Sequence, residues 1–177
     1  MNELRARVSE PDRLSHAVAV ETIMRRLAAA AGGAAEEWGL AGLLHDIDLA
    51  ETKADPSRHG VVGARLLAKL GFSEAVVRAV EAHDDAAGVP RKAPIDHGLY
   101  CADRIYWAVR SSGLTFPSAD ASAATPASVV AGLERRGARE RIDLKLTQEC
   151  GKIGLTLDEA LGHALESMRA VSASSPP

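Results

Sequence analysis

The stretch "GLLHDIDLAETKADPSRHGVVGARLL", residues 42–67, decides how the fold of this chain is interpreted. Its first half carries leucines and an isoleucine at helical spacing, which predicts a helix with one buried face. That apolar face ends in the doublet His45-Asp46, and a further imidazole, His59, precedes the next apolar run. Burying a polar side chain without a partner costs roughly 2–7 kcal/mol. Three such side chains beside an expected core therefore need a compensating interaction.

The composition predicts an all-α fold. Of the 177 residues, 46% are hydrophobic but only 3% are aromatic, so the core must be built from Leu, Val, Ile and many Ala. Alanine has the highest helix propensity, and a strand-like alternation of apolar and polar residues is absent from the sequence. A chain of this length is sufficient for one domain with a sizeable core. We therefore expect a single compact helical domain.

Start and stop signals divide the chain into successive helices. Ser9 is the expected cap of the first helix, Gly71 ends the third, and Thr156 with Glu159 forms a capping box that opens the last. The expected helices cover about residues 9–31, 34–48, 57–70, 73–83, 95–111, 126–137, 139–150 and 156–171. The expected organisation is a helical core at 1–112, a loop at 113–125, a C-terminal helical extension at 126–171 and a frayed tail at 172–177.

Charge and cysteine content exclude several classes of protein. A net charge of −3 and a pI near 6.1 provide no basic field for nucleic acid or an anionic membrane. Cys101 and Cys150 are too few for a disulfide framework and suit a reducing cytosol. The polar N-terminus lacks the apolar core of a signal peptide, and no apolar run reaches the ~18 residues of a membrane span. We expect a cytoplasmic protein without a nucleic-acid or membrane partner.

Six polar side chains on or beside apolar helix faces form a candidate ligand set. Taken singly, such a histidine is an ordinary capping or hydrogen-bonded core residue, and such an aspartate is an ordinary salt-bridge partner. Taken together, four imidazoles and two carboxylates suit a transition metal such as Fe, Mn, Co or Ni, whereas the absence of thiolates argues against a structural zinc site. The six residues are His16, His45, Asp46, His59, His83 and Asp103.

These residues and their contexts resemble the HD-domain superfamily of metal-dependent phosphohydrolases. The blocks "GLLHDID", "RHGVVGARLL", "VRAVEAHD" and "LYCADRIYW" occur in the order typical of that superfamily and span about residues 10–112. The resemblance implies a core of about five helices. It also implies a first metal bound by His16, His45, Asp46 and Asp103. His59 and His83 resemble the ligands of a second metal, with Asp46 bridging the two ions.

The resemblance further implies the hydrolysis of a phosphoric ester or anhydride by a metal-activated hydroxide. We expect two divalent ions, with Zn and Mg also acceptable, and a small phosphorylated substrate such as a nucleotide. Asp46 is then catalytic as the bridging ligand. Lys53 and Arg58 are the expected phosphate contacts because they neighbour the ligands in sequence, although each is also an ordinary surface charge.

Two alternative functions share this ligand set or this fold. Mixed-valent di-iron oxygenases of the superfamily use the same four histidines and two aspartates, and non-catalytic HD signalling modules usually lose ligands that this chain keeps. The blocks are similar to those of small bacterial HD hydrolases, including diadenosine tetraphosphate hydrolases. Alarmone hydrolases carry a Glu-Asp pair where this chain has Leu49 and Ala50, which argues against that activity. The sequence leaves the oligomeric state open, and a homodimer is compatible with it.

Overall fold

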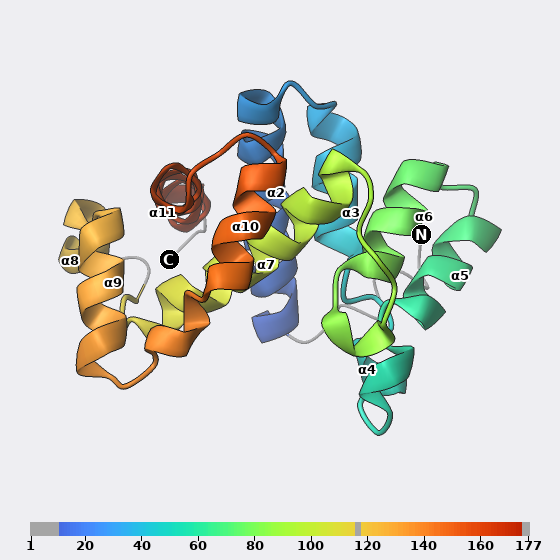
Figure 1. Ribbon diagram of the computed structural model, residues 1–177, viewed down its shortest axis with the longest axis horizontal. Helices are drawn as coiled ribbons and strands as arrows, with labels where there is room; N and C mark the ends of the chain where they lie inside the picture. The colour runs from blue at the N-terminus through green and yellow to red at the C-terminus, as the bar shows by residue number, and fades with distance from the viewer. Residues whose placement is uncertain (1–10, 116–117, 175–177) are drawn as a thin grey trace.

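Two long helices, α2 (Pro11–Ala31) and α7 (Pro94–Ser111), cross in the middle of the molecule (Figure 1). The computed structural model describes residues 11–115 and 118–174, and these residues form helices and connecting turns with no strand. The all-α prediction is confirmed. The predicted cap Ser9 lies outside the described residues.

Among the short helices in the first half of the chain, α3 packs on α2, and α6 packs on α3, α5 and α7. Gly42 lets α3 approach α2 closely, since a Cβ atom there would lie 2.9 Å from the backbone of Val20 and of Glu21. Ser73 caps α6 as predicted, with its side-chain oxygen accepting the backbone N–H of Val76. The elements are α3 (Ala35–Leu44), α4 (Leu49–Thr52), α5 (Val61–Lys69) and α6 (Glu74–Ala82), with 3₁₀ turns at Pro56–Arg58 and Asp85–Ala87.

The C-terminal helices cover α2 and α7. α10 packs on α7, while α11 packs on both long helices and brings leucines into the shared hydrophobic core. The predicted capping box is present, because the Glu159 carboxylate accepts the N–H of Thr156 and the Thr156 hydroxyl oxygen accepts the N–H of Glu159. The elements are α8 (Ala119–Ala123), α9 (Pro126–Arg135), a 3₁₀ turn at Arg139–Arg141, α10 (Leu144–Lys152) and α11 (Leu157–Ser174).

The doublet His45-Asp46 lies in a turn, so the prediction of a helix through residue 48 is wrong. After Leu44 the backbone forms tight i to i+3 hydrogen bonds, from the N–H of Ile47 to Leu44 and from the N–H of Leu49 to Asp46. The predicted helix at 57–70 likewise begins only at Val61, since the chain first forms a 3₁₀ turn and then passes through a glycine with positive φ.

Two other expected boundaries also differ from the structure. The loop predicted at 113–125 contains α8, which starts where the Ser118 hydroxyl oxygen accepts the N–H of Ala121 and continues through a run rich in alanine, the best helix former. The tail predicted to fray from 172 remains helical to Ser174. None of the described helices is long and apolar enough to cross a membrane.

Matched leucine substitutions test the packing of the C-terminal helices. Leu161 is 1% exposed within α11, and Leu144 is 72% exposed within α10. Leu161→Ala should lower the free energy of unfolding by about 2–5 kcal/mol, because it leaves a cavity in the core. Leu144→Ala should change it by less than about 0.5 kcal/mol. Urea denaturation followed by circular dichroism measures both, and equally small effects would contradict this packing.

Candidate metal centre

The six candidate ligands come from five separate segments that meet at one point. His16 lies on α2 and Asp103 on α7, at the crossing of the two long helices. The other four lie at helix ends or in turns: His45-Asp46 directly after α3, His59 between the 3₁₀ turn and α5, and His83 directly after α6. Because helix ends point inward here, polar side chains reach the core without interrupting a helix.

The Asp46 carboxylate lies between two pairs of imidazoles. Its Oδ2 atom is 3.5 Å from Nε2 of His16 and 3.4 Å from Nε2 of His45, and these two nitrogens are 3.0 Å apart. Its Oδ1 atom is 3.1 Å from Nε2 of His59 and 3.9 Å from Nε2 of His83, which are themselves 3.1 Å apart. Asp46 therefore faces one pair with each oxygen.

Asp103 lies on one side of this arrangement. Its Oδ1 atom is 3.2 Å from Nε2 of His16 and 3.8 Å from Nε2 of His45. It thus adds a second carboxylate to the first imidazole pair. The four imidazoles are all buried, with His45 fully so.

Hydrogen bonds to the other ring nitrogen fix three of the imidazoles. Nδ1 of His45 donates to the Gly42 carbonyl, and Nδ1 of His83 donates to the Val80 carbonyl, each at 2.7 Å and each three residues earlier in the chain. With Nδ1 committed in this way, the Nε2 atom of each ring faces the Asp46 carboxylate.

Asp48 fixes the orientation of the His59 ring through a hydrogen bond to its Nδ1 atom. Its Oδ1 atom lies 2.9 Å from Nδ1 of His59, and its Oδ2 atom accepts the backbone N–H of Gly63 at 2.7 Å. Asp48 is fully buried, so both oxygens are committed to orienting a candidate ligand and the start of α5. No role for Asp48 follows from the sequence alone. Its position two residues after Asp46 is the available signal, but only the fold shows which imidazole it meets.

Aromatic packing holds the fourth imidazole. The His16 ring lies against Tyr106 and Trp107 of α7, with centroid distances of 4.5 Å and 5.2 Å. Its Nδ1 atom is buried, and no hydrogen-bond partner for it occurs among the described residues. The orientation of His16 therefore depends on ring contacts, unlike that of the other three.

Gly60 allows the His59 segment to reach the centre. Its φ of +76° is a conformation that side chains disfavour, and a Cβ atom there would lie only 2.6 Å from the Val80 carbonyl oxygen. The chain therefore passes against the end of α6 just where His83 emerges. Close approach at this glycine is what brings His59 and His83 into one pair.

The carboxylates and imidazoles of the cluster shift one another's pKa values. Burial opposes protonation of His45, but the Asp46 carboxylate outweighs this and raises the pKa of His45 to about 9. Burial likewise opposes protonation of His59, while its hydrogen bonds to Asp46 and Asp48 raise the pKa to about 10. Burial opposes ionisation of Asp46, yet the imidazoles hold its pKa well below the usual range. Burial, with repulsion from the neighbouring imidazoles, lowers the pKa of His83.

This donor set fits divalent metal ions. Each of the groups His16, His45, Asp46 and Asp46, His59, His83 has three ligand atoms within 4.8 Å of one another. Two nitrogens that bind one ion at about 2.1 Å and at right angles are about 3.0 Å apart, which matches both imidazole pairs. Imidazole lone pairs that face each other repel unless a proton or a metal cation lies between them. The residues would therefore suit two ions that share Asp46.

An open cleft of about 350 Å³ leads to the cluster. Lys53 of the turn after α4 lines this cleft, whereas Arg58 is exposed on the following 3₁₀ turn and does not line it. The structure thus brings Lys53, but not Arg58, to the cavity above the cluster. The other lining residues are Asp46, Leu49, Thr52, Pro56, His59, His83, Asp84, Asp103 and Trp107.

Residues 13–107 match the sequence profile of the HD domain, which covers more than half of the chain and includes all six candidate ligands. The chain belongs to the HD domain family. This membership assigns it to a superfamily of metal-dependent phosphohydrolases, and the predicted resemblance is confirmed. Helices α8 to α11 lie beyond the HD domain match.

Two curated proteins show similarity to parts of this HD domain protein. Over 80 residues it is 35% identical to Ribonuclease Y of Lawsonia intracellularis, an alignment that covers 45% of this chain and 15% of that protein. Over 60 residues it is 43% identical to the uncharacterized protein MJ0778 of Methanocaldococcus jannaschii, covering 34% of each. The chain thus spans far less than two thirds of either relative.

Removal of Asp46 tests whether one carboxylate serves both imidazole pairs. Asp46→Ala should abolish metal binding at both positions, because each of its oxygens faces one pair. His59→Ala should leave the ion beside His16 and His45. Inductively coupled plasma mass spectrometry after dialysis against Mn or Co measures occupancy. Asp84→Ala is the control, since Asp84 lines the same cleft but accepts the N–H of Ala86. Full occupancy in Asp46→Ala would refute this centre.

Asp48→Asn tests the support given to His59. The amide can no longer accept both hydrogen bonds, so His59 loses its fixed orientation. Metal affinity at the position formed by His59 and His83 should fall by roughly 10- to 100-fold. Titration with Co, followed by its visible absorption, reports the two positions separately. Asp55→Asn replaces an exposed carboxylate that accepts the Ser57 hydroxyl and should change neither. An unaltered Asp48→Asn titration would argue against the role of Asp48.

Proposed function

We propose that this protein is a metal-dependent hydrolase of phosphoric esters or anhydrides that acts on a nucleotide or another small phosphorylated molecule. The observation that carries the proposal is the position of Asp46 between two buried imidazole pairs at the base of an open cleft. When bound, two divalent ions supply Lewis acidity and a nucleophile derived from water near neutral pH.

The residues around the cleft suit a phosphate group. The Lys53 ammonium is a mobile cation on the rim, and a phosphoryl oxygen at the cluster would lie within reach of its long side chain. Leu49 and Pro56 supply apolar walls beside it. The chain's own contribution is therefore to hold the six ligands rigidly and to add a cation where negative charge gathers on the substrate.

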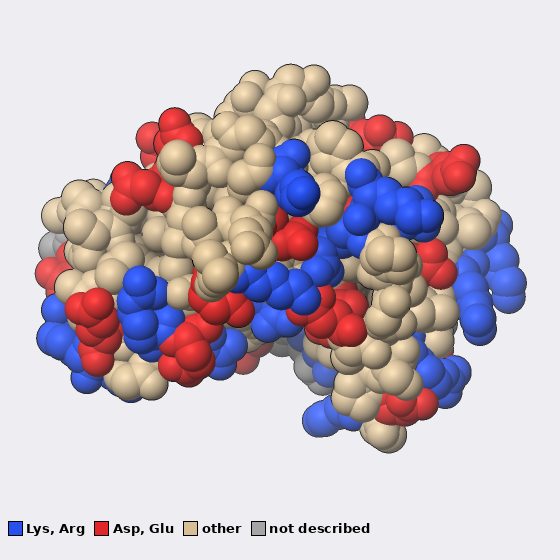
Figure 2. Space-filling model, in the orientation of Figure 1, with Lys and Arg blue, Asp and Glu red and all other residues tan. Residues whose placement is uncertain are grey.

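The cleft favours a small substrate over a polymer. A volume of about 350 Å³ lies in the range typical of small-molecule sites, roughly 300–1,000 Å³. Basic and acidic side chains are interspersed on the face shown in Figure 2, and the surface is hollowed between α4 and the segment before α10. The name Ribonuclease Y describes an enzyme of RNA phosphodiesters, which supports phosphoester chemistry, but the net charge of −3 favours a small phosphorylated substrate.

A substrate screen with controlled metals tests this function. The purified protein is supplied separately with Mn, Fe, Co or Ni and assayed with p-nitrophenyl phosphate, nucleotides, dinucleoside polyphosphates and an RNA oligonucleotide. We expect phosphate release from the small substrates and its loss in Asp46→Ala. Absence of hydrolysis with every metal, together with a mixed-valent di-iron resonance that responds to added organic substrates, would instead support the oxygenase alternative.

Lys53 and Arg58 can be compared directly as phosphate contacts. Lys53→Ala should keep its metal content and lower kcat/KM by roughly 10- to 100-fold, the expected loss of one charge-assisted contact. Arg58→Ala should cause a smaller loss, because Arg58 does not line the cleft. Steady-state kinetics on the best substrate of the screen separates them. Wild-type kinetics for Lys53→Ala would assign that residue to the solvated surface.

A further inference from the structure

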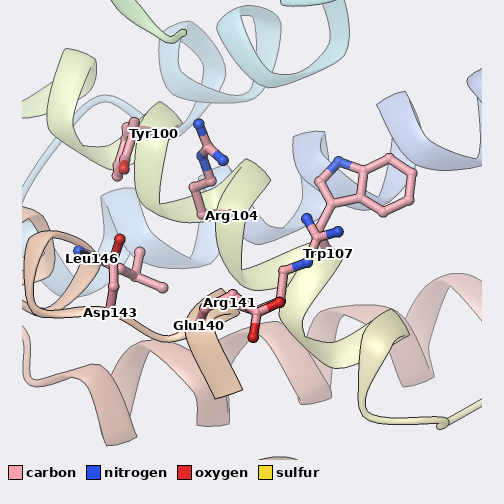
Figure 3. Close-up of a pocket in the computed structure, with 7 residues that line it drawn as sticks. All are labelled: Tyr100, Arg104, Trp107, Glu140, Arg141, Asp143 and Leu146. Atoms are coloured by element: carbon pink, nitrogen blue, oxygen red, sulfur yellow. Dashed lines mark hydrogen bonds between the residues drawn. The ribbon is translucent and has the colours of Figure 1, made fainter. Parts of the chain in front are cut away.

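A second cavity adjoins the metal centre along α7 (Figure 3). It encloses about 180 Å³, too little for a whole nucleotide-sized ligand but enough for part of one. One wall comes from α7, and the other comes from the 3₁₀ turn Arg139–Arg141 and the start of α10. The lining residues are Tyr100, Arg104, Trp107, Glu140, Arg141, Asp143 and Leu146.

Arg104 is a cation without a carboxylate partner in this cavity. Three cationic groups surround the Tyr100 ring, those of Arg91, Arg104 and Lys145. Arg91 and Lys145 both pair with Asp85, at 2.8 Å and 2.7 Å. For Arg104 the described residues provide no carboxylate within 4 Å, although its carbon lies 5.3 Å from the ring centroid. Its charge is therefore available to a ligand.

Arg141 provides a second such guanidinium from the opposite wall. It is exposed on the 3₁₀ turn, and it likewise has no ion pair within the described part of the chain. Asp143, by contrast, already accepts the N–H of Leu146 at 2.7 Å as the cap of α10. The cavity is thus lined by two guanidinium groups and by the two carboxylates of Glu140 and Asp143. Its guanidinium groups can pair with an anionic group of a ligand, while its carboxylates can accept hydrogen bonds from the rest of that ligand.

Trp107 connects this cavity with the metal centre. Trp107 lines both cavities and is 44% exposed, unusually open for a tryptophan. Arg104 directly follows the candidate ligand Asp103, and Trp107 follows Asp103 by four residues, about one helical turn. A ligand could thus extend from the metal cluster across the indole face to the two arginines.

We infer that this second cavity binds the leaving-group part of the substrate, and that this part carries a planar ring and an anionic group, as in a nucleotide. This inference rests on the proposed function. The ring stacks on Trp107, as bases stack on exposed aromatic side chains, and the anionic group pairs with Arg104 and Arg141. The carboxylates of Glu140 and Asp143 repel a purely anionic chain such as polyphosphate, so a ring with hydrogen-bonding groups suits the cavity better.

The cavity also belongs to this chain rather than to the HD domain alone. The family match ends at residue 107, and the wall from Glu140 to Leu146 lies beyond it. The ligand set is therefore supplied by the HD domain, whereas one wall of the second cavity is supplied by the C-terminal helices. The specificity for the leaving group accordingly depends on Arg104 and Trp107 of the HD domain together with the wall from Glu140 to Leu146.

Tryptophan fluorescence of the full chain tests binding without turnover. The probes are the hydrolysis-resistant analogue α,β-methylene-ADP, AMP, adenosine and ribose 5-phosphate. Trp38 is buried and Trp107 is exposed, so stacking should quench the signal of Trp107 alone. We expect quenching by α,β-methylene-ADP and AMP, weaker binding of adenosine, and no quenching by ribose 5-phosphate. Trp107→Phe should abolish the response.

Arginine variants then test the anionic contact. Arg104→Gln and Arg141→Gln should each weaken AMP binding about tenfold or more. They should also lower kcat/KM for ADP relative to that for p-nitrophenyl phosphate, whose leaving-group part carries no phosphate. Arg65→Gln, an exposed arginine on α5 outside both cavities, is the matched control. Metal content is measured for Arg104→Gln because Asp103 is adjacent.

The outcomes separate the two proposals. AMP binding that is insensitive to both arginines, with an unchanged kinetic ratio in an active enzyme, would overturn the second cavity as a substrate subsite while leaving the hydrolase intact. Arginine-dependent quenching without hydrolysis of any phosphoester would instead overturn the proposed function and support the cavity as a nucleotide-binding site.

Discussion

The structure depends on one partly exposed carboxylate, that of Asp46, which faces imidazoles on two sides. Asp46 lies where five segments meet, with one oxygen facing His16 and His45 and the other facing His59 and His83. The Nε2 atoms of these histidines and the Asp46 oxygens could together bind cations. The hydrogen bonds from His45 and His83 to carbonyls three residues earlier, and from His59 to Asp48, direct the remaining lone pairs inward. The packing of α2 against α3 and α7 thus serves to hold a concentrated polar centre inside an apolar core.

The sequence predicted the fold class and the gathering of polar residues because both follow from local patterns. Helical spacing, alanine content and capping residues act within a few residues of one another, and the blocks around His45 and His83 are local as well. The positions at which helices end were harder to predict from the sequence. The doublet His45-Asp46 continues an apolar helical pattern, yet the backbone turns at Leu44. In the folded protein Ile47 and Asp48 of that turn lie against Gly63 of α5, a contact between separate segments that no local spacing encodes.

Contacts between distant segments are the part of the site that the sequence does not predict. In the sequence Asp48 resembles any polar residue at a helix end. Only the fold shows that its two oxygens form hydrogen bonds with His59 and Gly63. The same is true of Arg141, which lies 37 positions after Arg104 and meets the same cavity only because α10 packs on α7. Spacing along the chain cannot reveal such pairs, since they depend on how a later helix returns to an earlier one.

The hydrogen bonds at the ends of α3 and α6 affect how the protein acquires a metal ion. His45 and His83 each satisfy a carbonyl at the end of the helix that carries them, so their side chains complete those helices whether or not an ion is present. The orientation of these two rings therefore does not depend on a metal ion, whereas small zinc domains need the ion in order to fold. An ion would reach the oriented rings through the cleft, and its identity would depend on which ions the cell makes available.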